Sequence, residues 1–335
     1  MSIQIGPIKT LNRVFLAPMS GVTDRPFRAA AHRAGAGLVV SEMVASEELV
    51  RERPDMMRRA KSAKHVSPFV MQLAGREAKW LSEGAKVAQD LGAEIIDINM
   101  GCPARQVTGG LSGSALMRNL DHALTLIEAT VGAARVPVTL KMRLGWDENS
   151  LNAPELARRA EQAGVALITV HGRTRCQFYT GKADWNAIRA VRNAIKIPLI
   201  ANGDGNSVED AKAMMAASGA DGVMIGRGAY GRPWLPAAIA KGLEAGTASQ
   251  VPCLAQQQSD LQIQHAETLT LYGNALGNKT FRKHLGWTIT RLAEQGYLTT
   301  ETTANYRATL LGQTDNTKVA LGIVEIFQQI DRQAA

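Results

Sequence analysis

Short, largely apolar runs recur along the first 225 residues and alternate with longer amphipathic stretches. A run without strict alternation of apolar and polar residues suits a parallel strand, because both faces of such a strand are buried. Eight strands are therefore predicted, at Val14–Ala17, Leu38–Val40, Phe69–Met71, Ile95–Ile98, Val138–Leu140, Leu167–Val170, Leu199–Ala201 and Val223–Ile225.

The amphipathic stretches between these runs have the spacing of surface helices. They include Glu77–Leu91, His122–Ala133, Pro154–Ala163, Trp185–Ala194 and Val208–Ala217. Several helices end in glycine just before the next strand, which is typical of a left-handed C-terminal cap. These glycines are Gly35, Gly92, Gly164 and Gly219.

Eight strand–helix units in one stretch of chain predict an α/β fold of the (β/α)8 TIM-barrel type. A doubly wound open sheet is the alternative, but it usually has fewer strands and lacks a regular eightfold count. We assign residues 1–245 to this barrel and 246–252 to a linker. Residues 253–335 contain helix formers and no strand-like runs, and they predict a helical C-terminal domain. Its four helices are expected at Leu261–Tyr272, Lys279–Gln295, Ala304–Leu311 and Lys318–Gln329.

Composition narrows the class of protein. No run of 18 apolar residues occurs, and the first residues lack the basic and apolar regions of a signal peptide. Three widely spaced cysteines, with no Cys-x-x-Cys pair, argue against a disulfide framework and against a zinc or iron–sulfur site. We therefore expect a cytoplasmic protein without a bound metal and without membrane association. We also expect a monomer, although no feature of the sequence determines the oligomeric state.

The formal net charge is +8, and its distribution is uneven. Residues 252–335 hold seven basic and seven acidic side chains, so the whole excess lies in residues 1–251. A basic surface favours polyanions, of which nucleic acid is the first candidate. Ordinary solubility charge is the alternative explanation.

Cys102 is the most informative single residue. It follows the fourth predicted strand on a loop between Gly101 and Pro103, where a buried structural cysteine would be out of place. A thiol held by turn residues at a strand exit is a candidate for chemistry on a substrate. The alternative is a small apolar packing residue.

The other strand ends carry polar and cationic groups that a TIM barrel would gather at one rim. The loops after the last two strands contain Gly203, Gly226 and Arg227, which suit a phosphate site, with simple tight turns as the alternative. Lys141 ends an apolar strand and needs an anionic partner, such as a reduced flavin, or a salt bridge to Asp97 or Glu42. Gln72 is a candidate to hydrogen-bond a flavin, or is a capped strand end.

Four segments together resemble the tRNA-dihydrouridine synthases, nearest to the bacterial B-type enzymes. They are Ala17–Asp24, Asp97–Pro103, His171–Thr174 and Asn202–Asp204, and Phe281–His284 in the helical tail extends the similarity. The resemblance implies a flavin-binding TIM barrel with a helical tRNA-binding domain. It also implies NADPH-dependent reduction of selected uridines in tRNA. Among these uridines, the similarity to the B-type favours the one at tRNA position 17, in the D-loop.

The resemblance further implies a role for each matching residue. Cys102 would be the proton donor to C5 of uracil, and reduced FMN would give a hydride to C6. Asn99, Arg143, Arg173 and Arg175 match positions near the flavin or the uridine, and we assign them to the substrate. The FMN contacts would come from Pro18, Met19, Ser20, Gln72, Lys141, His171, Asn202, Gly203, Asp204, Gly226 and Arg227.

Basic residues outside the barrel mouth are candidates for phosphate contacts with the RNA. They are Lys279, Arg282 and Lys283 in the tail and Arg58, Arg59, Lys61 and Lys64 in the barrel, and solvated helix faces are the alternative. Two other functions remain open at this stage. One is an FMN oxidoreductase of the dihydroorotate dehydrogenase kind, and the other is a non-catalytic RNA-binding protein.

Overall fold

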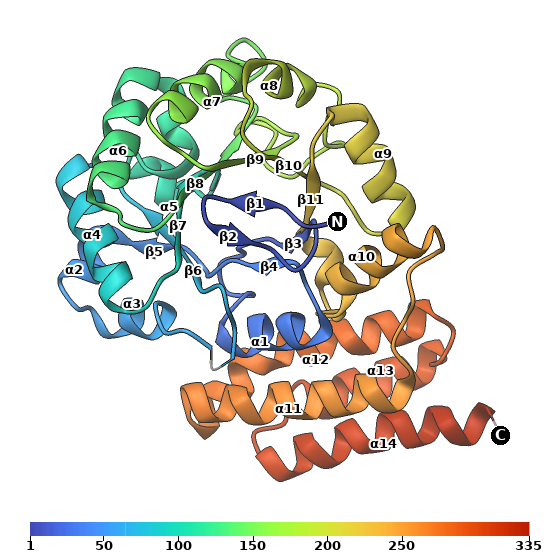
Figure 1. Cartoon of the computed structure of the whole chain (residues 1–335). Helices are drawn as coiled ribbons and strands as arrows, with labels where there is room; N and C mark the ends of the chain where they lie inside the picture. The colour runs from blue at the N-terminus through green and yellow to red at the C-terminus, as the bar shows by residue number, and fades with distance from the viewer. Residues whose placement is uncertain (64, 335) are drawn as a thin grey trace.

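Nine short parallel strands curl into a ring in a computed structural model that describes residues 1–63 and 65–334 (Figure 1). The candidate Lys64 lies outside the described residues. In chain order the strands are β3 (Val14–Leu16), β4 (Leu38–Val39), β5 (Val44–Ala45), β6 (Val70–Ala74), β7 (Ile95–Met100), β8 (Val138–Arg143), β9 (Leu167–His171), β10 (Leu199–Asn202) and β11 (Gly222–Ile225). Their order around the sheet is β4-β3-β11-β10-β9-β8-β7-β6-β5.

The two end strands of this order, β4 and β5, are halves of one barrel strand that is interrupted at residues 40–43. Val40 forms a bridge with Val70 of β6, and the Ser41 amide donates to the Val70 carbonyl at 3.1 Å. These contacts close the ring, so the predicted TIM barrel is confirmed and the open-sheet alternative is wrong. The break also turns Glu42 toward the first strand end, where its carboxylate accepts from the Gly21 amide at 2.5 Å.

Helices surround the ring, and all five helices predicted between the strands are present. The helices of the barrel are α1 (Arg25–Ala34), α2 (Ser46–Val50), α3 (Pro54–Arg59), α4 (Ala78–Asp90), α5 (Arg105–Gly109), α6 (Leu120–Ala133), α7 (Ala153–Gln162), α8 (Arg189–Ala194), α9 (Val208–Ser218) and α10 (Leu235–Ala245). The glycines predicted as caps, Gly35, Gly92, Gly164 and Gly219, all have a positive φ of 70° to 104°. Helix α8 starts four residues later than predicted, because residues 185–188 form a turn. The Trp185 indole donates to the Gly203 carbonyl at 2.8 Å.

An N-terminal hairpin of β1 (Gln4–Ile5) and β2 (Ile8–Lys9) covers one end of the ring (Figure 1). Ile3 and Ile5 are buried with Phe15, Ile95 and Ile200 in one apolar cluster. The hairpin therefore plugs the barrel at the amino ends of its strands.

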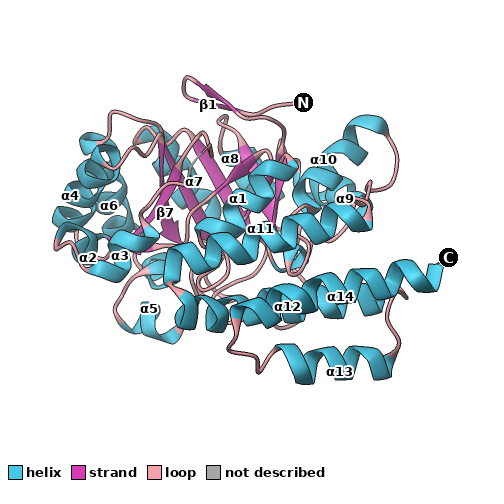
Figure 2. Ribbon diagram, turned by 90° about the horizontal axis from the view of Figure 1, so that it is seen from below, coloured by secondary structure: helices cyan, strands magenta, loops and turns pink. Residues whose placement is uncertain are grey.

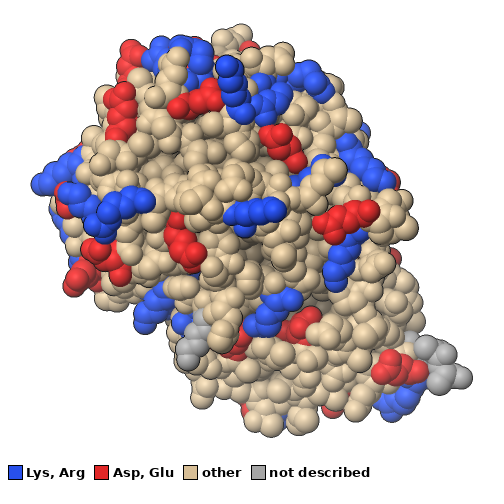
Figure 3. Space-filling model, viewed as in Figure 1, with Lys and Arg blue, Asp and Glu red and all other residues tan. Residues whose placement is uncertain are grey.

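On the face of the barrel that carries the hairpin, basic and acidic side chains are intermixed, without a broad basic patch (Figure 3).

The tail forms four helices, α11 (Leu254–Tyr272), α12 (Asn274–Glu294), α13 (Thr300–Leu310) and α14 (Asn316–Ala334). Each of them overlaps one of the predicted helices and begins before it, and α12 and α13 end one residue earlier than predicted. They share a separate apolar core, which includes Phe281, Leu285, Ile323 and Phe327. Figure 2 places α12, α13 and α14 toward the side of the barrel opposite the hairpin. None of the helices in the described part of the chain is long and apolar enough to cross a membrane.

Candidate active site

A cavity of about 920 Å³ opens at the carboxyl ends of the strands. Parallel strands bring their ends to one edge, so side chains far apart in sequence meet there. Cys102, Asn99 and Arg143 line this cavity together with every residue predicted to hold the cofactor: Pro18, Met19, Ser20, Gln72, Lys141, His171, Asn202, Gly203, Asp204, Gly226 and Arg227. The candidates Arg173, Arg175, Lys279, Arg282 and Lys283 are not part of its lining.

The backbone around Cys102 is held from both sides. The Asn99 side-chain oxygen accepts from the amides of Gly101 (3.2 Å) and Cys102 (3.0 Å). Ser114 donates its amide (3.1 Å) and its hydroxyl (2.8 Å) to the Cys102 carbonyl. Gly113 has φ of 61°, and a Cβ there would lie 2.8 Å from the Cys102 carbonyl oxygen, so only glycine fits this approach.

The Cys102 thiol is half-buried, and this burial raises its pKa. An unperturbed thiol already titrates above neutral pH. The side chain is therefore protonated at pH 7 and able to donate a proton.

A buried polar chain supports Asn99 from below. Asp97 accepts from the Thr139 hydroxyl at 2.6 Å and from the Gln72 amide nitrogen at 2.7 Å. The Gln72 oxygen in turn accepts from the Asn99 amide nitrogen at 2.8 Å. Gln72 thus uses its oxygen within the protein and retains one N–H for the cavity.

Lys141 projects into the same cavity without a carboxylate partner. Its Nζ donates to the Asn202 side-chain oxygen at 3.2 Å, and among the described residues it forms no ion pair with Asp97 or Glu42. Burial, and secondly the charge of Arg143, lower the pKa of Lys141 to about 8. A half-buried ammonium without a direct ion pair is a suitable binding group for an anionic or strongly accepting ligand.

His171 also lines the cavity with a polar atom that has no partner in the described part of the protein. Only 8 % of its surface is exposed, and its Nδ1 is buried with no hydrogen-bond partner among the described residues. Burial lowers the pKa of His171 well below its usual value, and the charges of Arg143, Lys141, Arg173 and Arg227 act in the same direction. The ring is therefore neutral, and its orphaned Nδ1 needs a partner from outside the protein.

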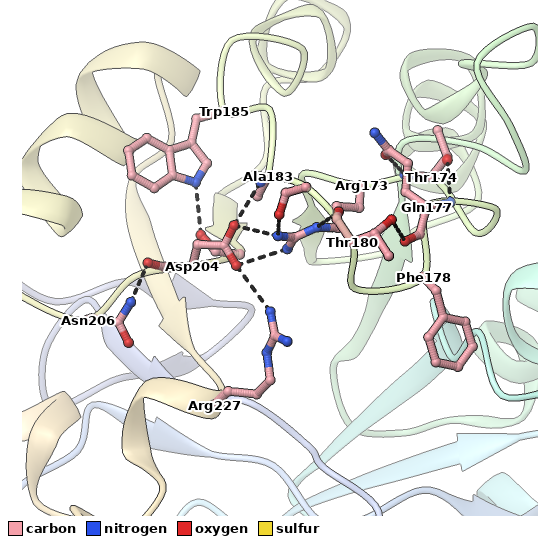
Figure 4. A network of polar contacts seen from close by, with 12 residues as sticks. Arg173, Thr174, Gln177, Phe178, Thr180, Ala183, Trp185, Asp204, Asn206 and Arg227 are labelled. Atoms are coloured by element: carbon pink, nitrogen blue, oxygen red, sulfur yellow. Dashed lines mark hydrogen bonds and ion pairs between the residues drawn. The ribbon is translucent and has the colours of Figure 1, made fainter. Parts of the chain in front are cut away.

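Asp204 organises the turn after β10 (Figure 4). Its carboxylate forms a bidentate pair with Arg173, at 2.6 and 2.9 Å, and a further contact with Arg227 at 3.2 Å. It also accepts from the Ala183 amide at 2.8 Å. Gly203 in this turn has φ of 125°, and a Cβ there would lie 2.6 Å from the Ala183 side chain.

Arg173 is 1 % exposed, which differs from its expected place at the substrate. Besides Asp204, its guanidinium donates to the carbonyls of Thr180 (3.0 Å) and Gly181 (2.6 Å), as Figure 4 shows. The side chain thus ties the loop after β9 to the Asp204 turn. In this arrangement it acts as a positioning residue behind the cavity wall.

Arg143 makes a second tie between loops. Its guanidinium donates to the carbonyls of Gly101 (2.9 Å), Thr174 (2.7 Å) and Phe178 (2.8 Å). It therefore joins the Cys102 loop to the loop after β9. Both Arg143 and Arg227 also lie over the ring of Tyr179, at 5.4 and 4.8 Å from its centroid.

Several cavity residues were missed by the sequence reasoning. Phe178 and Tyr179 are 40 % and 46 % exposed at the mouth, and Met43, Tyr230 and Arg291 also line it. Phe178 and Tyr179 could have been found from the sequence, because they are two adjacent aromatic residues that follow the strand end at His171 by a few positions. Arg291 had none, because it belongs to α12 and only tertiary packing brings it to Tyr230, whose carbonyl accepts from it at 3.2 Å.

Comparison with known proteins identifies the family. The dihydrouridine synthase family matches residues 15–325, which is most of the barrel and of the tail. The chain belongs to the dihydrouridine synthase family. The resemblance drawn from the sequence motifs is thereby confirmed.

Relatives of this dihydrouridine synthase align over most of their length. A protein of Rhizobium leguminosarum bv. phaseoli named "Probable tRNA-dihydrouridine synthase" is 58% identical over 283 residues, covering 84% of this chain and 86% of the relative. The "tRNA-dihydrouridine synthase B" of Xanthomonas axonopodis pv. citri is 45% identical over 286 residues, covering 85% and 86%. The second name agrees with the predicted B-type similarity.

A solved structure supports the fold. Morphinone reductase in complex with tetrahydroNAD superposes with a TM-score of 0.54 and 16% identity, covering 77% of this chain and 93% of the reductase. At this identity the likeness concerns the barrel architecture alone.

Proposed function

We propose that this dihydrouridine synthase reduces the 5,6 double bond of specific uridines in tRNA, with FMN as its bound flavin and NADPH as the reductant. The observation that supports this most is the half-buried Cys102 thiol at the edge of a cavity that is also lined by Lys141, whose ammonium donates to Asn202 and forms no ion pair among the described residues. A proton donor and a cation-lined ligand pocket are the two parts that such a reduction needs.

The residues of the cavity fit a flavin mononucleotide. Its volume of about 920 Å³ is that of a cofactor pocket. The orphaned His171 Nδ1, the Lys141 ammonium and the remaining N–H of Gln72 would meet the polar edge of the ring system. The Gly203 turn and Arg227 would hold the phosphate, which is the usual place for a phosphate in this fold.

When bound and reduced, FMN would supply a hydride for C6 of the uracil. Cys102 gives its proton to C5, so that the double bond gains one hydride and one proton. This role requires a neutral thiol, and its raised pKa keeps it neutral without help from a base. Asn99 and Ser114 hold the backbone of Cys102, which fixes the direction of proton transfer.

The target uridine must leave the RNA stack to reach this cavity, at a cost of a few kcal/mol. Arg59 and Arg291 line the cavity and would bind the neighbouring phosphates. Phe178 and Tyr179 offer exposed rings for stacking. We assign tRNA binding to residues 253–335 as well, where Lys279 is exposed and Arg282 and Lys283 are half-buried.

A half-reaction experiment tests this function. The protein is loaded with FMN, reduced anaerobically with NADPH, and mixed with unmodified tRNA or with orotate. We expect tRNA to reoxidise the flavin and to gain dihydrouridine in its D-loop, at position 17. Reoxidation by orotate instead would indicate a dihydroorotate dehydrogenase-like enzyme, and a protein that cannot bind flavin would indicate a non-catalytic RNA-binding protein.

Flavin affinity should depend on the charge of Lys141. Because the pKa of Lys141 is lowered to about 8, the ammonium is present at pH 7 and lost as the pH rises through 8. Binding that requires the charged form should be about tenfold weaker at pH 9 than at pH 7. Quenching of FMN fluorescence measures this affinity. Lys141→Met should bind weakly with no such step, whereas Lys212→Met, at an exposed lysine of α9, should follow the wild type.

A further inference from the structure

The outer part of the Cys102 loop is formed by α5, which follows Cys102 by three residues. Helix α5 has only five residues and no side-chain cap at its amino end, so its own hydrogen bonds stabilise it little. Nevertheless, Gln106 and Val107 of α5 line the cavity. The position of this wall must therefore be set by contacts with other elements.

Trp146 supplies such contacts from the turn between β8 and α7. The guanidinium carbons of Arg118 and Arg175 lie over its indole, at 5.0 and 4.7 Å from the ring centroid. Indole is the most favourable aromatic partner for a cation. We call these three residues, Arg118, Trp146 and Arg175, the tryptophan latch.

The backbone fixes Arg175 beside Trp146. The Arg175 amide donates to the Gly145 carbonyl at 3.0 Å, and the Cys176 amide donates to the Trp146 carbonyl at 2.8 Å. A Cβ at Gly145 would collide with the Ser150 carbonyl, so the turn is closed tightly. The Arg175 and Trp146 side chains therefore start from a rigid frame.

The latch reaches the Cys102 loop at two points. Arg175 Nη2 donates to the Thr108 hydroxyl of α5 at 3.3 Å, and that hydroxyl donates to the Ala104 carbonyl at 3.2 Å. Arg118 is the last residue of the short 3-10 segment Gly113–Arg118, which also contains the Ser114 that holds the Cys102 carbonyl. One indole thus connects the segments that precede and follow the turn at residues 110–112.

We propose that the tryptophan latch positions the Cys102 loop, so that α5 and the thiol keep their places at the cavity. Arg175 is then a positioning residue, and its contact with the loop replaces the direct substrate contact expected from the sequence. The consequence for uridine reduction rests on the function proposed above, but the effect of the latch on thiol accessibility does not.

Alkylation of Cys102 by iodoacetamide provides a readout that is independent of tRNA. The other two cysteines, Cys176 and Cys253, are exposed, so both are first replaced by serine. In this background we expect Trp146→Leu to raise the alkylation rate of the half-buried Cys102 about tenfold, because the freed loop opens more often. Thr108→Val removes the hydroxyl that accepts from Arg175 and donates to the Ala104 carbonyl, and it should change the rate in the same direction by a smaller factor.

Trp146→Phe keeps an aromatic ring for the two arginines and should return the rate to near that of the background. With bound FMN, Trp146→Leu should also slow reoxidation of the reduced flavin by tRNA about tenfold, while its reduction by NADPH changes less than twofold. This split separates a positioning effect from a general loss of folding, which would affect both half-reactions.

An unchanged alkylation rate in folded Trp146→Leu and Thr108→Val would overturn the proposal. If reoxidation by tRNA then still falls, the arginines contact the RNA directly and do not position the loop. If alkylation rises as expected but no variant, including the background, is reoxidised by tRNA, the latch stands and the proposed function fails. Should Trp146→Leu not fold, Thr108→Val decides the question alone.

Discussion

Replacing Cys102 by alanine should slow the reoxidation of the reduced flavin by tRNA by a factor of about 10²–10⁴, the usual contribution of a general acid. The substitution removes the one protonated thiol of the cavity while leaving Lys141, His171 and the Gly203 turn in place. Flavin binding and reduction by NADPH should therefore stay within about twofold of the wild type, because neither requires that proton.

Anaerobic stopped-flow measurements of the two half-reactions test this expectation. Cys253→Ala is the matched control, because that thiol is exposed and lies in the tail, away from the cavity. If tRNA reoxidises the Cys102→Ala enzyme at the wild-type rate, this thiol has no part in the mechanism. Loss of flavin binding in the same variant would instead assign Cys102 a role in the cofactor pocket.

Asp204→Asn should destabilise the flavin-free protein by about 2–3 kcal/mol, less than the full cost of breaking a buried ion pair, because Arg173 is buried but the Asp204 side chain is 28% exposed. The Arg173 guanidinium is 1% exposed and would keep its charge without a carboxylate to balance it. The asparagine side chain has nearly the same size, so the loss would come from charge and hydrogen bonding rather than from packing. The loop after β9, which Arg173 holds at Thr180 and Gly181, should loosen first.

Urea unfolding of the flavin-free protein measures this change without a contribution from ligand binding. Asp121→Asn is the control, since Asp121 pairs with Arg159 but is 90% exposed, and its loss should cost no more than about 1 kcal/mol. Combining Asp204→Asn with Arg173→Met removes both charges and should recover part of the stability. If Asp204→Asn and Asp121→Asn lower the free energy of unfolding equally, the pair of Asp204 with Arg173 stabilises the protein no more than an exposed pair does.

The strands that the sequence predicted share one property, which is a continuous apolar run between turn residues. The strands it missed, β1, β2 and β5, have two residues each. β4 is equally short, but Val40 extends it to an apolar run of three residues, whereas β1 and β2 each pair one polar with one apolar residue and offer no such run. Pairing across the barrel defines β5, and burial of Ile3 and Ile5 on the barrel floor keeps the hairpin in place.

The candidate site divides in a similar way. Residues at strand ends, such as Gln72, Asn99, Lys141 and Asn202, were predictable because parallel strands must bring their carboxyl ends together. The hydrogen-bond partners of the arginines could not be predicted in this way. Arg143, Arg173 and Arg175 stand close together in the pattern of the strand ends, yet each is bonded to loop carbonyls, a carboxylate or a hydroxyl from other segments.

By itself, the sequence determined the eightfold barrel, the helical tail, the family, and the rim on which Cys102 lies. These follow from local apolar runs and from motifs that are continuous in the chain. Only the tertiary structure decided which cations face the cavity and which serve as ties between loops. The reason is that a guanidinium on a long side chain takes its role from whichever acceptors lie within reach, and folding brings those acceptors from distant segments.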